Sequence, residues 1–234
     1  MVDCRTRAAL RLLIRSTIGL NRMKKTLTTL CTMLMCFLPL ALCAQGNSKK
    51  GMNNMNGKKV LVAFFSRADE NYNVGYIEKG NTQIIAEMIA EETGGTLFHI
   101  ETVTPYPADY MECIDIAKKE LNSKARPAIK GDAQVEDCDI IFLGDPNWWG
   151  NVPMAVYTFI EKHNWHGKTV IPFCTHEGSG LGSTEGKLKN ACKGATFLKG
   201  LAIQGATVQN RQSQARQSVM NWLDKLEIKN EVII

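Results

Sequence analysis

The sequence lacks the cysteine and histidine pairs that mark metal sites and redox dithiols. None of its eight cysteines belongs to a C-x-x-C pair. The four that follow the first 44 residues are widely and irregularly spaced, at Cys113, Cys138, Cys174 and Cys192. No two of the four histidines have the spacing typical of a metal site. We therefore predict no metal site and no redox dithiol. An oxidising compartment would permit a disulfide, but the spacing does not define its pair.

Nucleotide-binding and hydrolase motifs are also missing. The chain has no G-x-x-x-x-G-K-[ST] loop, no G-x-G-x-x-G after the first predicted strand and no G-x-S-x-G elbow. These absences argue against a nucleoside triphosphatase, a dinucleotide-binding fold and a serine hydrolase.

Beyond the N-terminal region the chain has no excess of positive charge. The whole sequence has a net charge of +5, but residues 1–44 hold seven of the 28 Lys and Arg and only one of the 23 Asp and Glu. The rest of the chain therefore has a net charge of −1. Nucleic-acid binding, which requires a positively charged surface, is not supported.

The N-terminal region resembles a secretory signal. Lys24 and Lys25 follow Met23, an apolar run extends from Leu27 to Leu42, and small or polar residues follow it. This run is shorter than a typical membrane span. We expect cleavage after Ala44. The alternative, lipid modification of Cys43, is less favoured because a bulky leucine precedes that cysteine.

The expected secretory signal divides the chain into three parts. We predict a leader at 1–44, a flexible tether at 45–57 that is rich in Asn, Gly, Lys and Ser, and a single domain at 58–228. Residues 1–22 are either an extended basic region or sequence upstream of a true start at Met23. The protein is expected to be periplasmic or associated with the cell envelope, and to contact the membrane only if Cys43 is lipidated.

Apolar patterning in the domain predicts an α/β fold. Five apolar or mixed strands alternate with five amphipathic helices. The strands are expected at Val60–Phe65, Thr96–Glu101, Ile140–Leu143, Thr169–Cys174 and Phe197–Ile203. Such alternation predicts one parallel sheet with right-handed crossovers and with helices on both faces.

Three loops follow three of these strands, at Ser66–Thr82, Asp145–Asn151 and Thr175–Thr184. Since parallel strands have their carboxyl ends at the same edge of the sheet, we expect the loops to converge there on a ligand. The first loop has hydroxyls and glycine before a helix, which favours an anion, although Gly80-Asn81-Thr82 could be an ordinary turn and cap.

The other two loops suggest a flat ligand. Trp148 and Trp149 would offer it aromatic surface, although either could instead cap the end of the sheet. The third loop is rich in glycine, which allows close approach of a ligand or simply a flexible turn. His176 could donate a hydrogen bond or a proton, or could simply be solvated.

Together these loops describe a ligand with a phosphate tail and a flat ring. With F-F-S and G-N-T in the first loop, G-D-P-N-W-W-G in the second and T-H-E-G-S-G-L-G in the third, the sequence resembles the flavodoxin family from Lys58 to Leu226. The resemblance implies a three-layer sandwich with a five-stranded parallel sheet of order 2-1-3-4-5.

The resemblance also implies flavin mononucleotide (FMN) as the cofactor, with the first loop at its phosphate and the other two loops at its isoalloxazine ring. The implied phosphate residues are Ser66, Arg67, Gly80, Asn81 and Thr82. The implied ring residues are Pro146, Asn147, Trp148, Trp149, Gly150, Thr175, His176, Gly178, Ser179 and Gly180.

Two features depart from the short family pattern. An insertion at Ala68–Lys79, with Tyr72 and Tyr76, separates Arg67 from Gly80, so that Arg67 could point away from the phosphate and the insertion could cover the site. The third loop has no aromatic residue, which leaves the two tryptophans as the expected stacking partners.

Three functions are compatible with this site. The first is electron transfer to a redox partner protein or a small electron acceptor at the exposed ring edge near Trp149. The second is NAD(P)H-dependent reduction of quinones or similar acceptors, with His176 as a proton donor, and the third is flavin binding without turnover. Electron transfer needs no catalytic acid or base. The absence of a second domain for NAD(P)H favours the carrier, whereas the near-neutral charge does not favour electrostatic steering of a basic partner.

Overall fold

The computed structural model describes residue 55 and residues 57–226. All of these residues belong to one compact unit, Gly51–Ile234. The predicted leader and most of the predicted tether lie outside the described residues. Within the described part of the chain, no helix is both long enough and apolar enough to cross a membrane.

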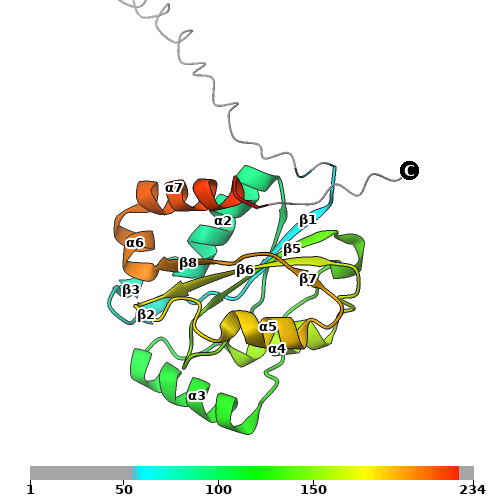
Figure 1. Ribbon diagram of the computed structural model, residues 1–234. Coiled ribbons are helices and arrows are strands. Elements are labelled where there is room, and N and C mark those ends of the chain that lie inside the picture. The colour runs from blue at the N-terminus through cyan, green and yellow to red at the C-terminus, as the bar shows by residue number, and fades with distance from the viewer. Residues whose placement is uncertain (1–54, 56, 227–234) are drawn as a thin grey trace, which may run out of the picture. The chain divides into compact units, whose positions relative to one another are not determined.

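A parallel sheet forms the centre of the domain (Figure 1). Its strands are β1 (Val60–Phe64), β4 (Thr96–His99), β5 (Ile140–Pro146), β6 (Thr169–His176), β7 (Thr196–Phe197) and β8 (Leu201–Gln204). The order is β4-β1-β5-β6, with β7 and β8 both paired to β6 as two segments of one fifth strand. The predicted parallel sheet with strand order 2-1-3-4-5 is therefore confirmed.

Helices cover both faces of the sheet and complete the three layers (Figure 1). On one face lie α2 (Asn81–Thr93), α6 (Gly205–Asn210) and α7 (Gln212–Leu223). On the other lie α3 (Tyr110–Ser123), α4 (Met154–Glu161) and α5 (Thr184–Ala191), while the 3-10 turn η1 (Val135–Asp137) leads into β5. α7 is the last helix expected from the sequence, and α6 is an additional short helix that precedes it and meets it at Arg211.

Successive side chains of each strand point to opposite faces of the sheet and so contribute to two separate buried cores. Val60, Val62 and Phe64 pack with α2 and α7, whereas Leu61 and Ala63 pack with α4 on the opposite face. Both sets are buried because each face of a parallel sheet is covered. The continuous apolar runs of the sequence therefore correspond to the central strands.

The fifth strand is interrupted, although the sequence pattern predicted one continuous strand. The Val170 carbonyl oxygen accepts a hydrogen bond from the Leu198 N–H of the fifth strand. Because the main-chain groups of every second residue face the same side of a strand, those of Pro172 in β6 also face the fifth strand. Proline has no N–H to donate there. The chain detours through Gly200, where a Cβ would lie 2.9 Å from Pro172 Cγ, before β8 resumes the pairing.

The insertion after β1 folds into an antiparallel hairpin of β2 (Asp69–Asn71) and β3 (Gly75–Ile77). The sequence showed no periodicity that would predict it. Asn71 Nδ2 lies within hydrogen-bond distance of three carbonyl oxygens, those of Arg67, Ala68 and Asp69, and orders the start of the hairpin locally.

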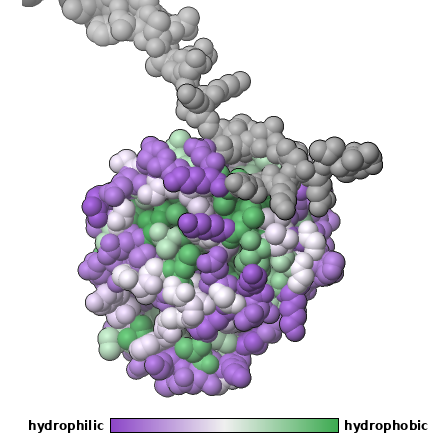
Figure 2. All heavy atoms as spheres, viewed as in Figure 1, coloured by the Kyte–Doolittle hydropathy of each residue, from purple (hydrophilic) through white to green (hydrophobic). Residues whose placement is uncertain are grey.

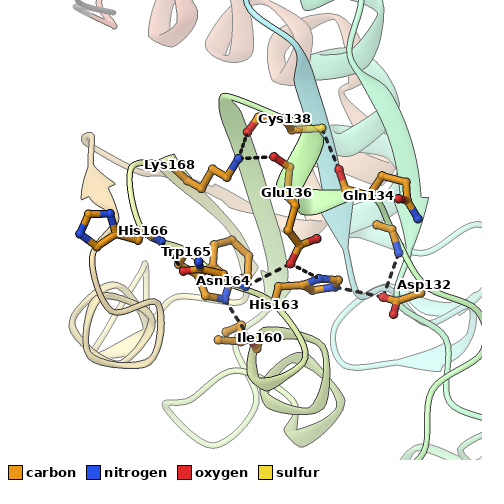
Figure 3. Close-up of polar contacts among 11 residues, drawn as sticks. Asp132, Gln134, Glu136, Cys138, Ile160, His163, Asn164, Trp165, His166 and Lys168 are labelled. Atoms are coloured by element: carbon orange, nitrogen blue, oxygen red, sulfur yellow. Dashed lines mark hydrogen bonds and ion pairs between the residues drawn. The ribbon is translucent and has the colours of Figure 1, made fainter.

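A polar network fixes the opposite edge of the sheet, where β5 and β6 begin (Figure 3). The buried His163 ring has Nε2 3.0 Å from Asp132 Oδ1 and Nδ1 3.3 Å from Glu136 Oε1. Lys168 Nζ donates to the carbonyl oxygens of Glu136 and Cys138. His163 thus has a structural role at the edge away from the three loops.

Candidate functional site

The three predicted loops converge on one pocket at the carboxyl edge of the sheet, with a volume of about 280 Å³. Nine of the fifteen predicted site residues line it: Arg67, Asn81, Pro146, Asn147, Trp148, Trp149, Thr175, His176 and Ser179. The other six, Ser66, Gly80, Thr82, Gly150, Gly178 and Gly180, lie in the same loops but do not line this pocket. The pocket also has residues that the sequence did not indicate, from the hairpin and α3.

The first loop approaches the start of α2 so closely that only glycine fits at residue 80. A Cβ on Gly80 would lie 2.2 Å from Ser66 Oγ and 2.5 Å from the Arg67 carbonyl oxygen. Ser66 Oγ accepts a hydrogen bond from the Gln83 N–H at 3.0 Å and so caps α2 from the preceding strand. Gly80-Asn81-Thr82 is therefore a helix start in which the cap comes from Ser66.

Side-chain hydrogen bonds tie the first loop to the C-terminal part of the domain. The buried hydroxyls of Thr82 and Thr175 are 2.8 Å apart and share a hydrogen bond. Asn81 Oδ1 accepts from Gln209 Nε2 of α6 at 2.7 Å. The phosphate loop predicted from sequence is thus held rigidly against the third loop and α6.

Arg67 extends away from the helix start. Its guanidinium donates to the carbonyl oxygens of Glu70, Pro107 and Ala108 at distances from 2.5 to 3.2 Å. These carbonyls belong to the hairpin and to the segment before α3. The main chain of Arg67 therefore belongs to the first loop, whereas its side chain lies at the wall formed by the hairpin and α3.

The two tryptophans of the second loop differ in their surroundings. Trp148 is partly buried, and its ring contacts Phe65 and Tyr106 edge to face at centroid distances of 5.3 and 5.1 Å. Trp149 is 47% exposed and has φ +56°. Its Nε1 donates to the Ile114 carbonyl of α3 at 3.1 Å. Trp148 therefore packs against the core, and Trp149 bridges from the loop to α3.

Asn147 joins the second loop to the third. Its Oδ1 accepts from the Gly150 N–H at 3.0 Å, and its Nδ2 donates to the Gly180 carbonyl at 3.2 Å. Gly150 and Gly180 both have positive φ, +70° and +59°, which glycine adopts without strain. The asparagine thus fixes two glycine turns on either side of the pocket.

His176 is neutral in this arrangement. Its Nδ1 accepts a hydrogen bond from the Gly178 N–H at 2.9 Å, so the neutral ring carries its proton on Nε2. Burial lowers the pKa of His176, and the nearby Glu177 carboxylate opposes this shift only in part. The side chain is therefore better suited to donate a hydrogen bond than to deliver a proton.

Glu177 organises the third loop. Its carboxylate accepts hydrogen bonds from the Ala206 N–H at 2.8 Å, from Gln204 Nε2 at 3.2 Å and from Asn73 Nδ2 at 3.0 Å. Asn73 is in the turn of the hairpin, so this carboxylate joins the insertion to the third loop. The insertion therefore contacts the third loop through Asn73 and contributes Asn71 and Tyr72 to the lining of the pocket.

Asp145 is a buried carboxyl that the sequence did not single out. It lies at the end of β5 beside Cys174 of β6, and its Oδ2 has no hydrogen-bond partner among the described residues. Burial raises the pKa of Asp145 well above its usual value. Burial therefore favours the protonated, neutral form of this carboxyl group at the start of the second loop.

The pocket residues missed from the sequence are mainly those of α3. Tyr110, Ile114 and Ala117 form a stripe with helical spacing, which is typical of a core-facing helix, but here it lines the pocket together with Cys113. The other missed residues are Asn71 and Tyr72 of the hairpin and Glu177 of the third loop. Only Tyr72 had a signal in the sequence, its place in the insertion.

None of the four cysteines of the domain forms a disulfide within the described residues. Burial raises the pKa of Cys113 to about 11 and that of Cys192 to about 12, so both remain thiols at neutral pH. No group of residues in the described part of the chain could hold a metal ion.

Comparison with known proteins gives consistent matches. A family model described as Flavodoxin matches residues 59–226. A candidate flavoprotein of Bacteroides eggerthii is 31% identical, with a TM-score of 0.57 over 71% of this chain and 96% of the other. A second, from Bacteroides uniformis, is 31% identical, with a TM-score of 0.58 over 72% and 99%.

A more distant structure shares the fold. It is a flavoprotein of Lactobacillus acidophilus in complex with FMN, 20% identical, with a TM-score of 0.51 over 67% of this chain and 99% of the other. A search of curated proteins finds no match.

Proposed function

The chain belongs to the flavodoxin family, and from that premise we propose that it binds FMN in the pocket at the sheet edge and acts in electron transfer. One observation carries the proposal: all three loops contribute to a single pocket. Ligands of open α/β sheets bind at this edge.

The start of α2 fits the phosphate group. The absence of a side chain at Gly80 lets Ser66 and the Arg67 main chain lie directly against the start of α2, which fixes the position of its first turn. The N–H groups of Asn81 and Thr82, in the first turn of α2, have no acceptor within the described residues. They lie at the positive end of the helix dipole. In this proposal the phosphate lies at the part of the pocket that Asn81 lines and is held by these main-chain groups, although the Thr82 side chain does not line the pocket. The Arg67 guanidinium does not hold it.

The second and third loops fit a flat ring. Trp149 lines the pocket and is 47% exposed, and Asn147 joins the two loops. His176 offers Nε2–H as a donor because Nδ1 is already occupied. FMN, when bound, supplies a redox centre that takes up and releases electrons. The protein's part is to hold the ring, limit its contact with water and donate hydrogen bonds to it.

We further propose that the protein works outside the cytoplasm, with a redox partner protein or a small electron acceptor that reaches the ring edge near Trp149. The leader pattern between Met23 and Ala44 supports export. The exposure of Trp149 supports access to the ring from solution.

A second candidate function is NAD(P)H-dependent reduction of quinones or similar acceptors. One observation favours it, because the pocket extends past the residues assigned to FMN to Tyr72 of the hairpin and to Tyr110 of α3. This extension gives space for a second molecule beside the ring.

Anaerobic absorbance spectroscopy of the purified protein with FMN separates these functions. Bound flavin bands that NADPH does not bleach would support a carrier that needs a reductase. Bleaching by NADPH that a quinone reverses would support the reductase instead. If bound flavin bands appear but neither NADPH nor a dithionite-reduced redox protein exchanges electrons, the protein only binds flavin. An absence of flavin bands and of flavin uptake would overturn the proposal.

A further inference from the structure

The wall of the pocket that the hairpin and α3 form is aromatic. It includes none of the residues that the family resemblance assigns to FMN except Arg67 and Trp149. The rings of Tyr72 and Tyr110 lie 6.0 Å apart with an interplanar angle of 32°. Tyr72 is 61% exposed although it lines the pocket. One edge of the pocket is thus an open aromatic surface.

The floor beside these rings is apolar and chemically inert. Ile114 and Ala117 of α3 line it together with Cys113, whose thiol stays protonated at neutral pH. Figure 2 shows hydrophobic residues interrupting the hydrophilic surface over α3, whose exposed apolar residues are Met111 and Ile116. An aromatic molecule placed here would bury its faces against apolar and aromatic side chains.

Arg67 places a fixed positive charge at the same wall. Its guanidinium is held by main-chain carbonyl oxygens, and no carboxylate forms an ion pair with it among the described residues. The other charged residue of the pocket, Glu177, is occupied by three hydrogen-bond donors. Four of the five N–H groups of Arg67 donate to main-chain carbonyl oxygens, so the guanidinium offers an anionic group on a ligand its positive charge and one remaining N–H on Nη1.

We propose that Tyr72, Tyr110 and Arg67 form a binding site for a planar aromatic anion, such as a quinone that bears a sulfonate or carboxylate. Its ring lies against the tyrosines, and its anionic group faces the guanidinium. Trp149, fixed to α3 through the Ile114 carbonyl, lines the same pocket and borders both this site and the proposed FMN position. The role of this site as a substrate site rests on the proposed function. Binding of the aromatic anion does not itself require FMN.

The test is calorimetric titration of the purified protein with anthraquinone-2-sulfonate, with and without saturating FMN. A neutral analogue, 2-(hydroxymethyl)anthraquinone, serves as the second probe. The structure supplies a matched control, because Tyr76 is on the same hairpin and is 72% exposed but does not line this pocket.

Tyr72→Ala should weaken binding of both probes by about 3- to 10-fold, because an aromatic contact is lost. Tyr76→Ala should leave both affinities unchanged. Arg67→Met should weaken the sulfonate by about 10-fold or more and leave the neutral analogue almost unchanged. Because Arg67 also holds the hairpin, thermal unfolding would check this variant, and Arg67→Lys would retain the charge if the methionine variant is unstable.

Three results would overturn the inference: equal affinity for the sulfonate and the neutral analogue in the wild type, equal losses from Tyr72→Ala and Tyr76→Ala, or complete displacement of the sulfonate by FMN. Displacement would mean that the probe occupies the FMN position. If FMN does not bind but the sulfonate shows the expected variant pattern, the proposed function fails and the aromatic anion site stands.

Discussion

Replacing Gly80 by alanine should disrupt the start of α2 because of two contacts. The new Cβ would meet Ser66 Oγ at 2.2 Å and the Arg67 carbonyl oxygen at 2.5 Å. Ser66 can turn away only by giving up its hydrogen bond to the Gln83 N–H, which caps α2. The carbonyl oxygen belongs to the main chain and can move only if the loop moves.

The expected loss of stability combines these two effects. Loss of a helix cap costs about 1 kcal/mol, and an overpacked main-chain contact costs about 1–3 kcal/mol. The free energy of unfolding should therefore fall by about 2–4 kcal/mol, as measured by urea unfolding of the FMN-free protein. FMN affinity should fall as well, because the displaced main chain is the proposed phosphate site.

Gly186→Ala is a matched control. Gly186 lies within α5, where a Cβ would meet nothing within 4 Å, so this variant should be as stable as the wild type or more stable by about 0.5–1 kcal/mol. If Gly80→Ala behaved like Gly186→Ala in both stability and FMN affinity, the close approach of the first loop to α2 would be refuted.

Three further predictions concern single side chains. Trp149→Ala should weaken FMN binding by about 1–3 kcal/mol with little loss of stability, because this ring is half exposed at the pocket; unchanged affinity in a fluorescence titration would remove it from the ring site. Burial lowers the pKa of His176 in the folded protein, whereas the unfolded chain binds the proton near pH 6.5, so stability should fall as the pH drops below that value. In His176→Gln the free energy of unfolding should depend less on pH, as measured by urea unfolding above and below pH 6.5. If the wild type and the variant show the same pH dependence, the pKa of His176 is not shifted. For Asp145 the pH dependence has the opposite sign, because burial raises its pKa in the folded protein. The free energy of unfolding should therefore fall as the pH rises above the pKa of the carboxyl group in the unfolded chain, near 3.8. Asp145→Asn should therefore be more stable than the wild type at neutral pH, and a less stable variant would show that the carboxyl group is ionised and paired.

The fold could be predicted from the sequence because its signals are local. Apolar runs such as Ile140–Leu143 are typical of central strands, and their regular alternation with helices predicted the parallel sheet. The positions of the three loops followed from the direction of parallel strands. The break in the fifth strand could not be predicted from that strand itself, because its cause is Pro172 in the neighbouring strand.

The site was predicted only in part because half of the pocket depends on tertiary contacts. Trp148 and Trp149 are equivalent in the sequence, and only packing against Phe65 and Tyr106 distinguishes the buried ring from the exposed one. Likewise, the stripe of α3 has the spacing of a core-facing helix. It lines the pocket because the hairpin and the second loop, rather than another helix, lie opposite it.

The central claim, that FMN binds with its phosphate at the start of α2, is tested most directly by titrating the FMN-free protein with FMN and with riboflavin. Quenching of flavin fluorescence would report both affinities. We predict saturation at one FMN per chain and at least about 10-fold weaker binding of riboflavin, which lacks the phosphate and its charge-assisted hydrogen bonds to Asn81 and Thr82. No saturable uptake of FMN, or equal affinity for the two flavins, would contradict this account.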